Sequence, residues 1–135
     1  MIDAGTHLIV DAFVRDNSVF TEKNFARLFE ILADALHMQI ILGPEFVSVP
    51  TNPDTFKRVQ ETNTFEDSGG TTAFCVVSTS HMSIHCWPLE NFFSLDVFSC
   101  KKYDADKALK IIRDVLGVNR DNTHIIDRQK PCAST

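Results

Sequence analysis

A chain of 135 residues with 44% hydrophobic and 23% charged side chains has the composition of an ordinary globular domain and is long enough to bury one core. Its net charge of −5 argues against a nucleic-acid-binding surface, which would gather lysine and arginine. No apolar run approaches the roughly 20 residues of a membrane span, and no signal-peptide pattern opens the chain. We therefore expect a single cytoplasmic domain over residues 1–135 that binds neither nucleic acid nor membrane.

The cysteines follow no disulfide or metal-site pattern. Cys75, Cys86, Cys100 and Cys132 form no CxxC pair, and no set of cysteine and histidine has the spacing of zinc ligands. We expect reduced thiols, two or three of them buried, and no bound metal.

The first half of the chain predicts a strand, a helix and a second strand. Residues 6–13 are rich in β-branched and aromatic side chains, as in a strand. Thr21 is a suitable N-cap for the helix that follows, and residues 38–49 predict a strand bent at Gly43-Pro44. Residues 50–70 are polar and irregular. The helix carries its apolar side chains at helical spacing: Phe25, Leu28, Phe29, Leu32 and Leu36.

The second half predicts three strand-like runs, a helix and a short last strand. The runs are residues 71–78, 82–87 and 92–100. Asp104 is a plausible N-cap for the second helix, and Gly117 fits the position just past its end. The last strand is expected near residues 123–127. One face of the second helix is apolar and carries Ala108, Ile111, Ile112, Val115 and Leu116.

The pattern predicts an α+β fold: a two-layer α/β sandwich in which two helices cover one face of an antiparallel sheet, in the order β-α-β-β-β-α-β. Leucine, isoleucine and phenylalanine alternate onto both faces of the strands. The face without helices therefore needs a cover, and we expect a homodimer.

Residues 78–100, STSHMSIHCWPLENFFSLDVFSC, gather a hydroxyl, an imidazole and a thiol. Each of these residues alone has an ordinary structural explanation. Ser80 before a strand is usually a turn residue, His85 could be a satisfied sheet histidine, and Cys100 at a strand end is most often a small buried side chain. The three residues in this order, with WP and DVF between them, indicate a shared chemical role more strongly than any one of them does alone.

Together with GTHLIVDAF near the N-terminus, this run resembles the bacterial and archaeal S-adenosylmethionine decarboxylases. The resemblance implies that the chain cuts itself between Thr79 and Ser80, giving a chain of residues 1–79 and a chain of residues 80–135. Ser80 would become a covalent pyruvoyl (pyruvate) cofactor, whose ketone forms a Schiff base with the substrate amine and draws electrons from it.

The resemblance also assigns roles to three other residues. His85 corresponds to a histidine that transfers a proton during processing, a role suited to imidazole near neutral pH. Cys100 corresponds to the cysteine that returns a proton to the α-carbon after carbon dioxide leaves. Thr72, in GGTTAF, stands where the family usually has a serine whose hydroxyl supports cleavage.

Two departures from the family pattern affect what we expect. Thr79 replaces the usual glutamate before the processed serine, and a β-branched residue restricts the turn that cleavage needs, so we predict slow cleavage. Leu89 replaces the glutamate of the usual WPE run, a residue expected to bind the substrate ribose, and Glu90 could supply that carboxylate one position later. Phe65 is the candidate for stacking on adenine, and Trp87 for walling the pocket.

The expected substrate is a small molecule of the amino-acid type, with S-adenosylmethionine first because it is the family's default. Its decarboxylation would supply the aminopropyl donor for spermidine synthesis. The same chemistry on a basic amino acid, ornithine or arginine, stays open. So does an uncleaved, non-catalytic homologue that acts by pairing with a partner chain.

Overall fold

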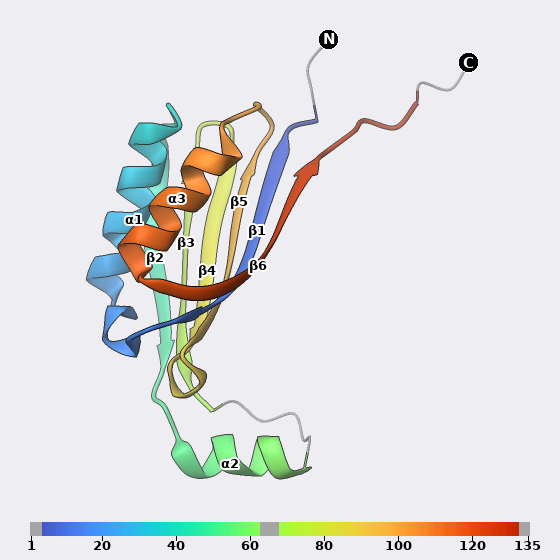
Figure 1. The fold of residues 1–135 in the computed structure, drawn as a ribbon. Helices are drawn as coiled ribbons and strands as arrows, with labels where there is room; N and C mark the ends of the chain where they lie inside the picture. The colour runs from blue at the N-terminus through green and yellow to red at the C-terminus, as the bar shows by residue number, and fades with distance from the viewer. Residues whose placement is uncertain (1–3, 63–67, 133–135) are drawn as a thin grey trace.

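The computed structural model describes residues 4–62 and 68–132, and these residues form one antiparallel sheet of six strands with helices on one side (Figure 1). The spatial order of the strands is β2-β3-β4-β5-β1-β6. The α+β fold expected from the sequence is therefore confirmed. The strands are β1 (Thr6–Val14), β2 (Ile40–Val49), β3 (Gly70–Val77), β4 (Ser80–Trp87), β5 (Phe92–Ser99) and β6 (Val118–Asp127).

Two long helices, α1 (Glu22–Ala35) and α3 (Ala105–Leu116), lie side by side across one face of the sheet (Figure 1). Both begin at the residues that the sequence predicts. The Thr21 hydroxyl accepts a hydrogen bond from the backbone N–H of Asn24, and the Asp104 carboxylate accepts one from Lys107. Gly117 ends α3 in the left-handed conformation, with a φ of 65°, which glycine adopts without steric cost.

The element order expected from the sequence needs two corrections. It counts one strand too few, because four strands, β2 to β5, stand between α1 and α3. It also lacks α2 (Pro53–Thr62), which occupies half of the stretch expected to be irregular and lies beyond one end of the sheet, away from the other helices (Figure 1). The local signal for α2 is Asn52, whose side-chain oxygen accepts hydrogen bonds from the N–H groups of Asp54 and Thr55. Short 3₁₀ turns occupy Asn17–Val19 (η1) and Pro88–Glu90 (η2).

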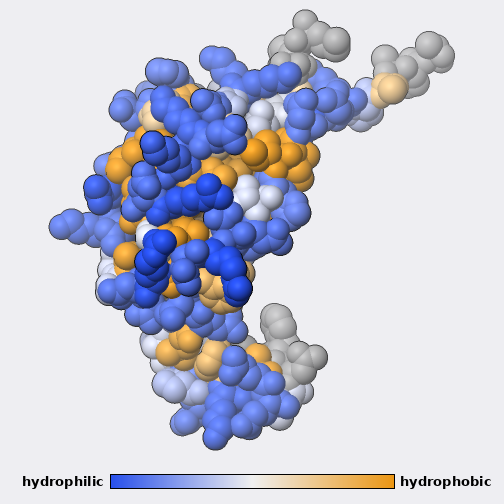
Figure 2. All heavy atoms as spheres, in the orientation of Figure 1, coloured by the Kyte–Doolittle hydropathy of each residue, from blue (hydrophilic) through white to orange (hydrophobic). Residues whose placement is uncertain are grey.

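The core lies between the sheet and the layer formed by α1 and α3. Alternate side chains of β1, β3, β4 and β5 are buried on this side, and they meet the apolar faces of both helices. In Figure 2 the outer surface of the helical layer is mainly hydrophilic, with hydrophobic side chains visible only in patches. The largest fully buried side chains include Phe25, Phe29, Phe93, Leu8, Leu28 and Leu32.

The other face of the sheet has no helix over it in the described part of the chain. Along β4 and β5 its side chains are polar or aromatic, and most of them are half-buried. His7 and Asp96 form a hydrogen bond on this face, with 2.8 Å between Nε2 and Oδ1, and Phe13 and Phe74 are 40% and 39% exposed. Within residues 4–62 and 68–132, no helix is both long and apolar enough to cross a membrane.

Candidate active site

The bond that the sequence predicts to be cleaved lies in the tight turn between β3 and β4. Val77 pairs with Ser80 across this hairpin, so only Ser78 and Thr79 lie in the turn. The carbonyl oxygen of Thr79 accepts a hydrogen bond of 2.8 Å from the backbone N–H of Cys100. An N–H aimed at a carbonyl oxygen polarises the carbonyl group and stabilises the negative charge that nucleophilic attack places on it. The turn therefore presents a carbonyl prepared for attack, next to a serine hydroxyl.

Cys100 follows directly after β5, and its side chain is exposed. Ser80 pairs with Ser99 on the neighbouring strand, which brings the backbone of Cys100 against the Thr79-Ser80 bond. Gly5 packs against the same backbone: a Cβ added at Gly5 would collide with the carbonyl oxygen of Ser99 and with Cα of Cys100. The glycine of the N-terminal motif thus lets β1 begin close to the site.

A small cavity of about 140 Å³ adjoins this turn on the helical side. The residues that line it come from the turn, from the end of α1 and from the segment after β5. Two lysines follow Cys100 at this place and give the cavity a cationic wall. The lining residues are Leu36, His37, Met38, Thr79, Ser99, Lys101, Lys102 and Tyr103.

His85 and Thr72 meet on the open face of the sheet. They pair across β3 and β4, and 2.5 Å separates Thr72 Oγ1 from His85 Nδ1. The indole of Trp87 packs edge-on against the imidazole, with 4.3 Å between the ring centroids. The structure therefore brings together the two residues expected to assist processing and holds the imidazole between a hydroxyl and an aromatic ring.

This imidazole lies far from the turn of the same chain. Ser80 begins β4, whereas His85 lies five positions along it, opposite Ser94 rather than Ser99. At about 3.3 Å per residue, the separation along the strand is roughly 17 Å. The expected set is thus divided into two halves, Thr79, Ser80 and Cys100 at one end and Thr72 with His85 towards the other.

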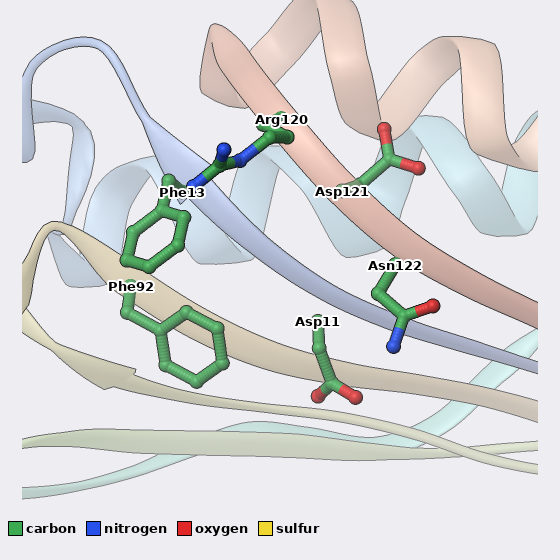
Figure 3. A pocket seen from close by; sticks show the side chains of 6 residues that line it. All are labelled: Asp11, Phe13, Phe92, Arg120, Asp121 and Asn122. Carbon is green, nitrogen blue, oxygen red and sulfur yellow. The ribbon is translucent and has the colours of Figure 1, made fainter.

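Two adjoining cavities lie at the His85 end of the sheet. The first, of about 430 Å³, is shown in Figure 3, where the rings of Phe13 and Phe92 lie together and the Arg120 side chain reaches over Phe13. Trp87 continues this aromatic row, 5.3 Å from Phe92. The lining residues of the first cavity are Asp11, Phe13, Phe92, Arg120, Asp121 and Asn122.

The second cavity, of about 550 Å³, lies between α2 and the end of the sheet. Leu89 and Glu90 both line it, so the carboxylate that follows the Trp-Pro-Leu run is at the wall of a cavity. Phe56 and Gln60 contribute from α2, the helix that the sequence did not predict. Phe65, the expected adenine-stacking residue, lies outside the described residues.

Sequence reasoning missed two residues beside the turn. Ser99 is fully buried, and its hydroxyl donates to Thr79 Oγ1 at 2.8 Å. Tyr103 joins β1 to β5: its phenol accepts from the N–H of Leu8 at 3.1 Å and donates to the carbonyl of Val97 at 2.5 Å. Burial raises the pKa of this phenol, so it stays protonated and can donate. Only the register of the strands reveals these contacts, and no local sequence signal does.

The comparisons with known proteins point to one family. The family model described as S-adenosylmethionine decarboxylase matches residues 6–129. The S-adenosylmethionine decarboxylase proenzyme of Parasynechococcus marenigrum is 33% identical over 73 residues, which are 53% of this chain and 56% of that protein. The arginine decarboxylase proenzyme of Aeropyrum pernix is 26% identical over 65 residues, 47% of this chain and 49% of that one. The alignments span between 35% and 58% of the curated relatives' lengths.

The whole fold is similar to that of a solved structure. The adenosylmethionine decarboxylase from Aquifex aeolicus superposes with a TM-score of 0.69, and the match covers 100% of this chain and 98% of that one. The sequence identity is 19%, so this likeness concerns the fold.

Proposed function

Because the chain belongs to the S-adenosylmethionine decarboxylase family, we propose that it is a pyruvoyl-dependent decarboxylase that makes its own cofactor by cutting between Thr79 and Ser80. The observation that carries the proposal is the hydrogen bond from the Cys100 N–H to the Thr79 carbonyl oxygen, 2.8 Å long, in the turn that Ser80 ends. S-adenosylmethionine is the first choice of substrate.

In the proposed cleavage, the Ser80 hydroxyl oxygen bonds to the carbonyl carbon of Thr79. The carbon–nitrogen bond of the peptide breaks, and the hydroxyl proton ends on the freed nitrogen of Ser80, so an ester replaces the amide. The Cys100 N–H stabilises the oxyanion through which this exchange passes. The ester then loses the α-proton of Ser80 and its Cβ–Oγ bond, which releases residue 79 as a carboxylate. Addition of water and loss of ammonia leave the pyruvoyl terminus on residue 80.

The residues around Ser80 fit such a group. The residue lies at the first position of β4, paired with β5, so a cofactor formed there stays anchored by the sheet after the chain is cut. A pyruvoyl group supplies an acceptor for the electrons left on the α-carbon when carbon dioxide departs. Cys100 is exposed and adjoins residue 80 through the strand pairing, which supports its role as the proton donor to that carbon.

We propose that each complete site uses two copies of the chain. His85 and Thr72 lie on the open face, roughly 17 Å along the strand from Ser80. A second copy packed on this face, with its strands running the opposite way, would bring its His85 to the end of β4 where the first copy's Ser80 lies, if the two-fold axis crossed β4 near its middle. One such dimer would contain two equivalent sites and would cover the half-exposed aromatic side chains on the open face of each copy.

The two cavities at the His85 end are the proposed place for the part of the substrate that does not react. Phe13 and Phe92 offer aromatic surface for a base, and the Glu90 carboxylate can accept hydrogen bonds from ribose hydroxyls. Trp87 packs against both His85 and Phe92, and it stays a proposed wall of the substrate site. Phe65 stays a proposed contact to adenine on the resemblance alone.

A basic amino acid is the second candidate substrate. Leu89 takes the position of the usual carboxylate, and one relative is named an arginine decarboxylase proenzyme. The carboxylates of Asp11 and Glu90, one in each cavity, would match a guanidinium or an ammonium group.

The test is release of labelled carbon dioxide by purified protein given S-adenosylmethionine, arginine or ornithine, each labelled at the carboxyl carbon. We expect release from S-adenosylmethionine, and release from arginine or ornithine alone would establish the second candidate. The matched control is Ser80→Ala, which lacks the nucleophile and should release none. A Ser80→Ala protein with full activity would rule out the pyruvoyl mechanism, and a cleaved chain inert on all three substrates would require another amine-bearing acid. A wild-type chain that stays uncut and inactive would instead support the non-catalytic homologue.

A further inference from the structure

We propose that the hydroxyl pair of Ser99 and Thr79 is a positioning element for self-cleavage, an inference that rests on the proposed function. In it, Ser99 holds the side chain of the residue whose carbonyl is attacked. The two hydroxyls take no part in the bonds that form or break; of these two residues, only the backbone carbonyl of Thr79 reacts.

Ser99 is unusual because it is a polar side chain with no exposed surface, at the end of β5. Its hydroxyl makes two hydrogen bonds. It donates to Thr79 Oγ1 at 2.8 Å and accepts from the backbone N–H of Lys101 at 3.0 Å. The bond from the Lys101 N–H fixes the position of the hydroxyl oxygen, and the serine proton points at Thr79.

Thr79 is consequently held at two points. The Cys100 N–H holds its carbonyl oxygen, and the Ser99 hydroxyl holds its side chain. Both donors belong to consecutive residues of one strand end, so they move together. Hydrogen bonds to its side chain and to its carbonyl oxygen restrict rotation about the backbone bonds of Thr79, which limits the orientations of the carbonyl group beside Ser80.

The pair also bears on the replacement of the usual glutamate by threonine. A β-branched side chain has few rotamers, and the bond from Ser99 selects among them. The β-branched side chain of Thr79 restricts the turn and so predicts slow cleavage, but the bond from Ser99 also uses this restriction to hold Thr79 in one conformation. Other residues at this position could not be held in this way unless they carried an acceptor at the same place.

The experiment follows cleavage over time by denatured mass in four variants of the full chain. Ser99→Ala and Thr79→Val each remove one hydroxyl, and we expect each to slow cleavage roughly tenfold, the worth of one hydrogen bond lost in the transition state. The double variant should be no slower than the slower single variant, because the two hydroxyls act as one contact. Ser99→Thr keeps a hydroxyl and should retain most of the rate.

Cleavage at the wild-type rate in either single variant, or slowing that multiplies in the double variant, would overturn the inference. The melting temperatures of the same variants, measured in an uncleavable Ser80→Ala background, separate positioning from stability. If Ser99 has only a structural role, its replacement lowers the melting temperature, and the effects of the two substitutions on the cleavage rate multiply. If Ser99→Ala does not fold, the partly exposed Thr79→Val decides alone. A wild-type chain that never cleaves overturns the proposed function as well, whereas a cleaving wild type with unaffected variants overturns only this inference.

Discussion

Cys100 differs from the buried thiols in exposure, which the proposed proton donor needs. Burial raises the pKa of Cys75 to about 11 and also raises that of Cys86, and both side chains lie in the core. Cys100 is exposed beside the Thr79-Ser80 bond. Of these three thiols, only Cys100 has the position for transferring a proton at the site.

Replacing Cys100 with alanine should therefore separate the two reactions. Only its backbone N–H contacts the Thr79 carbonyl, and alanine keeps that donor, so cleavage should proceed at nearly the wild-type rate. Turnover should fall by roughly a hundredfold or more, because a general acid contributes about 10² to 10⁴ in rate. Denatured mass and carbon dioxide release measure the two steps. Equal loss of both would show that the assigned role is wrong.

Thiol labelling tests the same distinction without mutation. At pH 8 a thiol of pKa about 11 is ionised to roughly one part in a thousand, so Cys75 should resist iodoacetamide in the folded protein. Cys100 and Cys132 are exposed and should be modified. Peptide mass after brief treatment locates the label. Labelling of Cys75 as fast as of Cys100 would mean that the core opens readily.

Sequence reasoning proposed Ser80, His85 and Cys100 as the chemistry-bearing residues from their order, their spacing and the family resemblance, but it did not predict how the turn before Ser80 is held. Ser99 and Tyr103 could not be found in that way, because their partners Thr79 and Leu8 are distant in sequence and adjacent only through strand register.

At the scale of elements, α3 is tied to β6 by a paired ion contact. Arg113 donates to both carboxylate oxygens of Asp121, at 2.9 and 3.1 Å, and the Asp121 side chain is 12% exposed. The guanidinium holds the pKa of Asp121 below its ordinary value, and the Thr123 hydroxyl acts in the same direction. In Figure 3 the Asp121 side chain points away from Asp11 and the two phenylalanines, as this contact with α3 requires.

Asp121→Asn should lower the free energy of unfolding by about 1 kcal/mol at pH 7, a value kept small because Arg113 is 48% exposed. The lowered pKa means that this contribution is present above about pH 4, the ordinary carboxyl pKa, and is lost as the pH falls through the folded-state value. Urea unfolding at pH 7 and at about pH 2 measures the difference in free energy of unfolding between the wild type and Asp121→Asn. A gap between the two proteins that persists unchanged in acid would exclude the ion pair as its cause.

The elements that the sequence predicted best are those with a local signal at each end. Thr21, Asp104 and Gly117 mark the ends of α1 and α3 as expected. Helix α2 was missed because it is polar: Phe56 and Val59 are its only large apolar side chains, and it buries only Thr55. β6 begins at Val118, ahead of the expected residue 123, because its first half is polar and forms a strand by pairing with β1.

At the scale of the whole molecule, the open face of the sheet and the divided site support the same proposal. A dimer through this face would cover the half-exposed side chains and unite Ser80 of one copy with His85 of the other. The division of the site could not be predicted from spacing, since five residues are close in sequence yet roughly 17 Å apart along a strand.

Co-expression of two defective chains tests this arrangement. A Ser80→Ala chain keeps His85, and a His85→Ala chain keeps Ser80, so a mixed dimer contains one complete site. The His85→Ala chain should stay largely uncut alone and become cut when the Ser80→Ala chain is present. The control partner is a chain with both substitutions, which should rescue nothing. If the His85→Ala chain is cleaved equally with either partner, His85 does not act on the other copy: it either acts within its own chain or has no role in cleavage.

The central claim is that the protein converts its own Ser80 into the cofactor, and the denatured mass of the purified wild-type chain tests it most directly. We predict two polypeptides, residues 1–79 and residues 80–135, the second beginning with a pyruvoyl group instead of a serine. A single polypeptide of intact mass after long incubation would contradict the account.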